Sequence, residues 1–285
     1  MYSLPKDHQA MPRSTIPFLR DPRHFQLLFL GGFLLYGILA LQWDVRLGDY
    51  AVLLGTALGV QYLFIRRHGL DLRSLKSAGI TGLGLSILLH AGHPLTLAFA
   101  AAVAIASKFL LRIDGKHVFN PGMLGIVAAV ALTGDAWISP GQWGSGVALV
   151  FLVGAAGLMV LLRCGRIDTT LAFLGTFAAL DLLRTVLYLG WGLDVWGHRL
   201  MNGSLLLFAC FMITDPMTTP KALRARVLWA MMIAAIAFVM GSWAYVHTAP
   251  IWALFALSAA TPVLDRAFGG ERFRWLGVER LNAKG

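Results

Sequence analysis

The amino-acid sequence predicts an all-α integral membrane protein of about ten transmembrane helices, arranged as two inverted halves of five. Three observations predict it: a low content of charge, a series of apolar segments, and basic residues confined to alternate connections. Charged residues make up 13% of the 285 residues and hydrophobic residues 58%, whereas soluble domains carry about 25% charged residues. Most of the surface is therefore not expected to face water.

The apolar segments define the expected spans, because a helix needs roughly 20 apolar residues to cross the hydrocarbon core. The expected spans are 25–43, 50–65, 78–90, 95–111, 118–134, 145–163, 169–190, 200–214, 227–247 and 249–265. The third and eighth are short, which is typical of half-helices that line a site inside a membrane protein. We expect a single transmembrane domain over 25–266, between cytoplasmic tails at 1–24 and 267–285.

Basic residues fix the expected orientation. The tails and every second connection hold 21 of the 24 lysine and arginine residues, while Arg46 and Arg199 lie in the other connections and Arg184 lies inside a span. The positive-inside rule then predicts a multi-pass protein of the bacterial inner membrane with both termini in the cytoplasm. This membrane orientation accounts for the net charge of +10. Nucleic acid is not expected as a partner, since no basic amphipathic stripe is present.

The number of spans also predicts an internal repeat. Five spans precede the connection at 141–146 and five follow it, which gives halves at about 25–134 and 145–266. An odd number of spans in each half inserts the two halves with opposite orientation, as in inverted repeats. Each half carries one polar residue before a proline at the edge of an apolar segment: Asn120 in the first half and Asp215 in the second.

Charged and polar residues gather before the fifth expected span. Lys108, Arg112, Asp114 and Lys116 precede the Asn-Pro-Gly sequence at 120–122. Proline removes a backbone donor and glycine weakens a helix, so backbone groups are freed here. One interpretation is a broken helix whose end faces an anionic or polar ligand. The alternative is a positively charged loop followed by a proline at an ordinary helix start.

A second polar segment follows the eighth expected span. Asp215 comes after an apolar run and before two prolines, and hydroxyl groups of Thr214, Thr218 and Thr219 surround it. Such hydroxyls can bond freed carbonyls or cap the next helix. The functional interpretation is a re-entrant turn with Asp215 lining a site. The alternative is an Asp N-cap in a cytoplasmic loop.

A pair of opposite charges lies inside the seventh expected span. Asp181 and Arg184 are three residues apart, so on a helix they share a face and can form an ion pair. Intramembrane charges are costly unless they face the bundle interior. The pair is either part of a functional relay or a structural contact that fixes the helix. No metal site is expected, because the two cysteines show no ligand spacing.

Three segments, taken in order, resemble the RnfD/NqrB family of membrane proteins. They are Phe119–Met123, Thr214–Pro216 and Thr261–Asp265, and the resemblance extends from about residue 25 to 266. That family comprises the RnfD component of Rnf electron-transport complexes and the NqrB component of the sodium-translocating NADH:quinone reductase. The resemblance implies ten helices in two inverted halves, similar to urea and ammonium channels. It also implies bound flavin and electron transfer coupled to cation movement.

One motif of that family is missing. Its complex-bound members carry a Ser-Gly-Ala-Thr sequence whose threonine holds FMN covalently, and nothing between Asn120 and Asp215 matches it. The Ser-Ala-Ala-Thr sequence at 258–261 lies after Asp215 and aligns better with the terminal motif. The chain is most similar to the stand-alone, UnbU-like branch of the family, so a non-covalent flavin, FMN or riboflavin, is expected.

The first functional hypothesis is therefore an electron-transfer subunit, coupled to cation movement, that lacks complete catalytic machinery of its own. Basic groups near a flavin favour its reduced anionic form. Because the chain shows no nicotinamide, iron–sulfur or haem motif, redox partner proteins are expected to supply and remove electrons. The residues expected to hold the flavin are Lys108, Arg112, Asp114, Lys116, Asn120, Thr214, Asp215 and Thr218.

Two other hypotheses belong to different classes. One is a channel or transporter for a small polar solute or cation on the same fold, with Asn120 and Asp215 lining the pore. The other is a structural membrane anchor for a partner enzyme. Bound flavin separates the first hypothesis from these two, because fold alone does not fix function.

Overall fold

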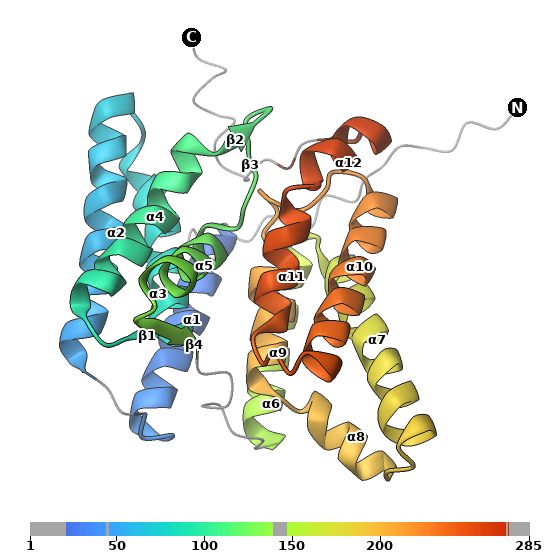
Figure 1. Cartoon of the computed structure of the whole chain (residues 1–285). Helices are drawn as coiled ribbons and strands as arrows, with labels where there is room; N and C mark the ends of the chain where they lie inside the picture. The colour runs from blue at the N-terminus through green and yellow to red at the C-terminus, as the bar shows by residue number, and fades with distance from the viewer. Residues whose placement is uncertain (1–20, 44–45, 139–146, 272, 274–285) are drawn as a thin grey trace, which may run out of the picture.

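The computed structural model describes residues 21–43, 46–138, 147–271 and 273 and is predominantly helical (Figure 1). The helices of the first part of the chain are α1 (Pro22–Leu39), α2 (Leu47–His68), the short 3-10 helix η2 (Leu72–Ser74), α3 (Leu75–Leu88), α4 (Pro94–Leu110) and α5 (Pro121–Thr133). Those of the second part are α6 (Val147–Cys164), α7 (Ile167–Leu182), η4 (Leu183–Tyr188), α8 (Leu193–Leu200), α9 (Gly203–Leu207), η5 (Phe208–Met212), α10 (Leu223–Trp243), α11 (Ala249–Ser258) and α12 (Thr261–Phe268). Segments η4 and η5 are π-helical continuations of α7 and α9.

A helix occupies each range in which the sequence predicts a span, and the all-α membrane class is confirmed. By length and composition, the helices Leu47–His68, Ile167–Tyr188 and Leu223–Trp243 can each cross a membrane. The bent pair Ala249–Ser258 and Thr261–Phe268, which meets at 52°, would be a fourth crossing. The chain is thus a multi-pass membrane protein, while the count of ten crossings and the inverted repeat stay predictions.

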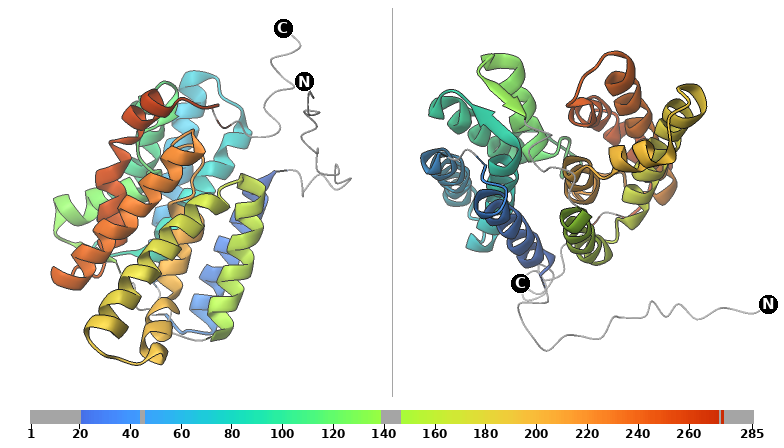
Figure 2. Two further views of the ribbon diagram at one scale, coloured as in Figure 1. Left: turned by 90° about the vertical axis from the view of Figure 1, so that its right-hand side faces the viewer. Right: turned by 90° about the horizontal axis from the view of Figure 1, so that it is seen from below.

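The helices form two groups that follow the order of the chain (Figures 1 and 2). In the first group α1 packs against α3, α2 against α3 and α4, and α4 against α5. In the second group α7 and α11 pack against α10, while α6 packs against α9 and η5. The groups meet where α1 packs against α6 and α5 against α11.

Two short antiparallel pairings join loops of the first group. Strand β1 (Leu89–Ala91) pairs with β4 (Ala136–Ile138), and β2 (Arg112–Ile113) pairs with β3 (Lys116–His117). The β2–β3 hairpin turns at Asp114 and Gly115, both of which have positive φ angles, 51° and 73°. An Asp-Gly pair is the favoured sequence for such a turn. This hairpin was not among the elements expected from the sequence, although the Asp-Gly pair is its signal.

The start of α1 is fixed by its N-cap. The Asp21 carboxylate accepts a hydrogen bond from the Arg23 backbone N–H at 3.1 Å and forms ion pairs with Arg23 at 2.9 Å and with Lys76 at 3.2 Å. Burial by itself raises the pKa of Asp21, but the hydrogen bonds and charges of Arg23 and Lys76 outweigh it and hold the pKa at about 2. Asp21 is therefore ionised at neutral pH and ties α1 to α3.

Helices α4 and α5 approach each other closely at Gly125. A Cβ atom added to Gly125 would lie 2.5 Å from the backbone oxygen of Ala100 and 2.8 Å from the Cβ of Ala104. Both alanines are fully buried, and the atoms in contact are a backbone oxygen and a methyl carbon. No flexible side chain is therefore available to move aside. Because α5 begins at the Asn-Pro-Gly sequence, this contact fixes the helix that carries one wall of the site described next.

Candidate functional site

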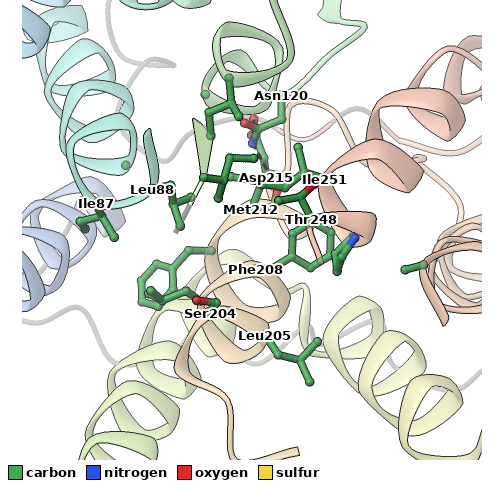
Figure 3. Close-up of a pocket in the computed structure, with 18 of the residues that line it drawn as sticks. Ile87, Leu88, Asn120, Ser204, Leu205, Phe208, Met212, Asp215, Thr248 and Ile251 are labelled. Atoms are coloured by element: carbon green, nitrogen blue, oxygen red, sulfur yellow. Dashed lines mark hydrogen bonds between the residues drawn. The ribbon is translucent and has the colours of Figure 1, made fainter. Parts of the chain in front are cut away.

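A cavity of about 730 Å³ lies between the two groups of helices and is lined by residues of both (Figure 3). Its polar lining includes Lys108, Asn120 and Asp215 as well as the ion pair of Asp181 and Arg199. Apolar side chains also line it, among them Leu30, Ile80, Ile87, Leu88, Leu205, Phe208 and Met212. Its size and mixed lining are typical of pockets that hold cofactors or other small molecules.

Asn120 joins the two proline-containing breaks expected from the sequence. Its Oδ1 accepts a hydrogen bond from the Met123 backbone N–H at 3.1 Å, so it is the N-cap of α5. Its Nδ2 donates to the Met212 carbonyl at 3.2 Å and lies 3.5 Å from Oδ2 of Asp215. The Met212 carbonyl is free for this contact because η5 ends there. Figure 3 shows Asn120, Met212 and Asp215 together at one wall of the cavity.

Asp215 presents its carboxylate to the cavity while its neighbours bond the backbone. Oδ1 of Asp215 accepts from the Met217 backbone N–H at 3.0 Å. Thr214 donates its hydroxyl to the Cys210 carbonyl at 2.7 Å, and Thr218 donates to the Asp215 carbonyl at 3.2 Å. Thr214 and Thr218 thus bond backbone carbonyls, one of the two alternatives expected for these hydroxyls, whereas the Thr219 hydroxyl accepts from Nε of Arg166 at 3.0 Å. Thr214 and Thr218 are buried and are not among the described residues that line the cavity.

Lys108 contributes a buried amine to the same wall. Its ammonium group donates to the carbonyl oxygen of Ser77 at 3.0 Å and to the Ser77 hydroxyl at 3.1 Å. Together with Asn120 and Asp215, this group offers two kinds of donor and one carboxylate acceptor beside an apolar space, an arrangement that suits a planar ligand with mixed donors and acceptors.

The other residues of the expected flavin site lie outside this cavity because the β2–β3 hairpin carries them elsewhere. Arg112 and Asp114 are exposed; Arg112 donates to the Gly115 carbonyl at 2.8 Å, and Asp114 lies 4.0 Å from Arg266. Of the eight residues predicted to hold the cofactor, three line the cavity in the described structure.

Lys116, on the same hairpin, is buried in a second polar cluster. Its ammonium donates to Oδ2 of Asp265 at 2.7 Å and to the Thr219 carbonyl at 2.6 Å. Burial lowers the pKa of Lys116, and the hydrogen bond and charge of Asp265 act in the opposite direction. Because Asp265 belongs to α12, this ion pair ties the hairpin of the first group to the end of the second.

The predicted ion pair between Asp181 and Arg184 is wrong. Asp181 pairs instead with Arg199 of α8, at 2.9 Å, and Arg184 donates to the Ser242 carbonyl at 3.3 Å. The physical reason is that α7 continues as π-helix from Leu183, and the wider turn carries Arg184 away from Asp181. Arg199 was missed as a partner, although it is one of the few basic residues outside the positive-inside pattern.

Comparison with known proteins identifies the family. The profile of the NQR2, RnfD, RnfE family matches residues 129–274, slightly more than half of the chain. This segment includes Asp181, Arg199 and Asp215 but not Asn120.

Two curated relatives share one name. One is the D component of the ion-translocating oxidoreductase complex of Pseudomonas paraeruginosa (strain DSM 24068 / PA7), 26% identical over 90% of this chain and 94% of that protein. Another is the protein of the same name from Stutzerimonas stutzeri, 30% identical over 66% of this chain and 46% of that protein. The resemblance seen in the sequence motifs is confirmed, and the chain belongs to the NQR2, RnfD, RnfE family.

Proposed function

We propose that this protein is a membrane subunit of an ion-translocating oxidoreductase complex, and that it holds a non-covalent flavin in the cavity between its two groups of helices. The observation that carries the proposal is the wall formed by Lys108, Asn120 and Asp215 beside an apolar space of about 730 Å³. Family membership supports it, because the relatives are named as subunits of ion-translocating oxidoreductase complexes.

The residues of this wall fit the edge of an isoalloxazine ring. That edge offers one imide N–H and two carbonyl oxygens, which match the carboxylate of Asp215 and the donors on Lys108 and Asn120. When bound, the flavin supplies the redox chemistry, and the protein supplies position and electrostatics. The Lys108 ammonium stabilises negative charge on the reduced ring, since a nearby positive charge favours an anionic form. Other subunits of the complex would deliver and remove the electrons.

A spectrum of the purified protein tests the proposal. The protein is purified in mild detergent, and its absorbance and fluorescence are measured before and after acid precipitation. Flavin released into the supernatant is the expected result. Flavin that stays with the precipitated chain would show a covalent attachment. A colourless, folded protein that also fails to bind added FMN or riboflavin would overturn the proposal.

Substitution of Asn120 is expected to separate its structural role from its role in flavin binding. Asn120→Ala removes both the N-cap of α5 and the amide donor, whereas Asn120→Ser keeps a good cap without that donor. Loss of one hydrogen bond is worth about 0.5–1.5 kcal/mol, so both variants should bind FMN roughly 2- to 10-fold more weakly.

Both variants lose the hydrogen bond to the Met212 carbonyl, and Asn120→Ala should melt earlier than Asn120→Ser in the same detergent, because loss of a cap costs a further amount of about 0.5–2 kcal/mol. Fluorescence titration of the flavin-free protein measures the affinity, and thermal unfolding measures the stability. Unchanged affinity in both variants would remove Asn120 from the flavin site.

One observation favours the alternative of a solute or cation channel: charged groups line the cavity at the Asp181–Arg199 pair as well as at Asp215. A cavity lined by several charged and polar groups is typical of permeation routes. Flux of a small solute such as urea, or of sodium, through liposomes containing the colourless protein would support this alternative. The absence of flux, together with bound flavin, would reject it.

A further inference from the structure

His117 lines both the large cavity and a second, small cavity of about 10 Å³. Among the described residues that line these two cavities, His117 alone is common to both. Asn120, which belongs to the polar wall of the large cavity, follows His117 by three residues, so their Cα atoms lie no more than about 11 Å apart. His117 is therefore placed between the small cavity and the wall proposed to hold the flavin ring.

The small cavity lies between the β2–β3 hairpin and α12, which share one end of the molecule (Figure 1). Its lining includes Lys116 and Asp265, which form the buried ion pair. It also includes Asp114 at the turn of the hairpin, whose side chain is 59% exposed. Its volume is close to the space that one water molecule requires. The small cavity is therefore a polar space for one water molecule, with an exposed carboxylate at its edge.

The Thr261 hydroxyl, at the start of α12, is the group that calls for this water. Thr261 lines the small cavity and is 2% exposed, and its Oγ1 has no hydrogen-bond partner among the described residues. Buried hydroxyls are nearly always bonded, and water completes such groups where other polar partners are at hand. Asp265 accepts from Lys116 and from the Lys221 backbone N–H, and a carboxylate has about four acceptor sites. A water beside Thr261 therefore has a second partner available.

The other titratable groups of the ring wall and of the small cavity each line one cavity alone. Lys108 and Asp215 line the large cavity, whereas Asp114, Lys116 and Asp265 line the small one. None of these groups connects the two spaces. A proton that passes from the small cavity to the large one therefore has His117 as its carrier.

We propose that the small cavity holds a bound water molecule and that His117 transfers protons between this water and a flavin in the large cavity. The inference rests on the proposed function. Two-electron reduction of the ring to its anionic reduced form takes up one proton, which His117 donates before it is reprotonated from solvent through the water. Reoxidation runs the same steps in reverse, and redox partner proteins supply and remove the electrons. Imidazole suits this role because it both donates and accepts protons near neutral pH.

Proton release during reoxidation tests the role of His117. The FMN-loaded protein is reduced anaerobically in detergent and mixed rapidly with ferricyanide, which accepts electrons without protons. Flavin absorbance follows the electrons, and a pH-indicator dye in weakly buffered solution follows the proton. The two signals should keep pace in the wild type. In His117→Gln, which keeps a polar side chain that does not carry a proton, proton release should lag at least about 10-fold, since a positioned acid–base group contributes about 10²–10⁴-fold.

A pair of variants at Thr261 tests the water. Thr261→Val removes the hydroxyl with little change of shape and should delay proton release, whereas Thr261→Ser keeps the hydroxyl and should delay it less. NMR of the FMN-loaded, ¹⁵N-histidine-labelled protein gives a readout without turnover. The imidazole N–H signal that disappears in His117→Gln should exchange with solvent more slowly in Thr261→Val than in Thr261→Ser. The matched control is His68→Gln, at an exposed histidine that lines neither cavity, and it should match the wild type.

Proton release in step with electron transfer in His117→Gln would overturn the proposal, as would equal behaviour of Thr261→Val and Thr261→Ser in both measurements. If His117→Gln does not fold, the Thr261 pair decides, because Thr261 does not line the flavin cavity. Flavin absorbance of each sample separates the two levels of the argument. A protein that binds no flavin would overturn the proposed function and this inference together, whereas bound flavin with undelayed proton release would overturn this inference alone.

Discussion

Replacing Lys116 with methionine is expected to destabilise the protein by about 3–5 kcal/mol, the usual cost of removing one partner of a buried ion pair. Lys116 and Asp265 have side chains only 8% and 6% exposed, and their charged atoms lie 2.7 Å apart. Without the ammonium, the Asp265 carboxylate keeps a single described donor, the Lys221 backbone N–H at 2.7 Å, and the Thr219 carbonyl loses its contact with Lys116. The link between the β2–β3 hairpin and α12 is lost at the same time.

Thermal unfolding in one detergent measures this effect, and two further variants serve as controls. Lys116→Met/Asp265→Leu should recover much of the loss, because replacing both charges of a buried pair with apolar groups is often neutral. Arg112→Met, an exposed position on the same hairpin, should stay within about 0.5 kcal/mol of the wild type. If Lys116→Met melted like Arg112→Met, the pair would contribute nothing and the burial of the hairpin would need another explanation.

Gly125→Ala is expected to destabilise the protein by about 1–3 kcal/mol through overpacking, although alanine is the better helix former by about 1 kcal/mol. The new methyl group would lie 2.5 Å from the Ala100 carbonyl oxygen, so α4 and α5 must separate. Because α5 begins at Asn120, the shift should also move the N-cap and weaken flavin binding. Melting curves and FMN titration of the same preparation measure both effects.

The matched control for this substitution is Gly55→Ala on α2. An added Cβ at Gly55 meets no atom within 4 Å, so only the gain in helix propensity remains, and the protein should be unchanged or slightly more stable. Both variants replace a glycine within a helix with alanine, and their changes in the free energy of unfolding should differ in sign. A similar loss in both would show that the close approach of α4 and α5 is not what fixes glycine at position 125.

The sequence predicted the polar residues of the cavity wall. Asn120 and Asp215 each stand before a proline at the edge of an apolar segment, which is a local pattern, and their roles at two helix breaks follow from it. Lys108 stood out as a charge at the end of an apolar run. Their meeting in one cavity requires both breaks to face each other, and only the packing of the two groups of helices brings this about.

The sequence by itself determined the membrane class, the family and the positions of the helices, because apolar segments, motifs and helix-breaking residues are local signals along the chain. The tertiary structure alone decided the partners of the buried charges. Asp265 is 149 residues from Lys116, and Asp181 finds Arg199 18 residues away because a π-helical segment turns Arg184 aside. No local pattern encodes such contacts, since a buried charge pairs with whichever opposite charge the packing of helices brings within reach.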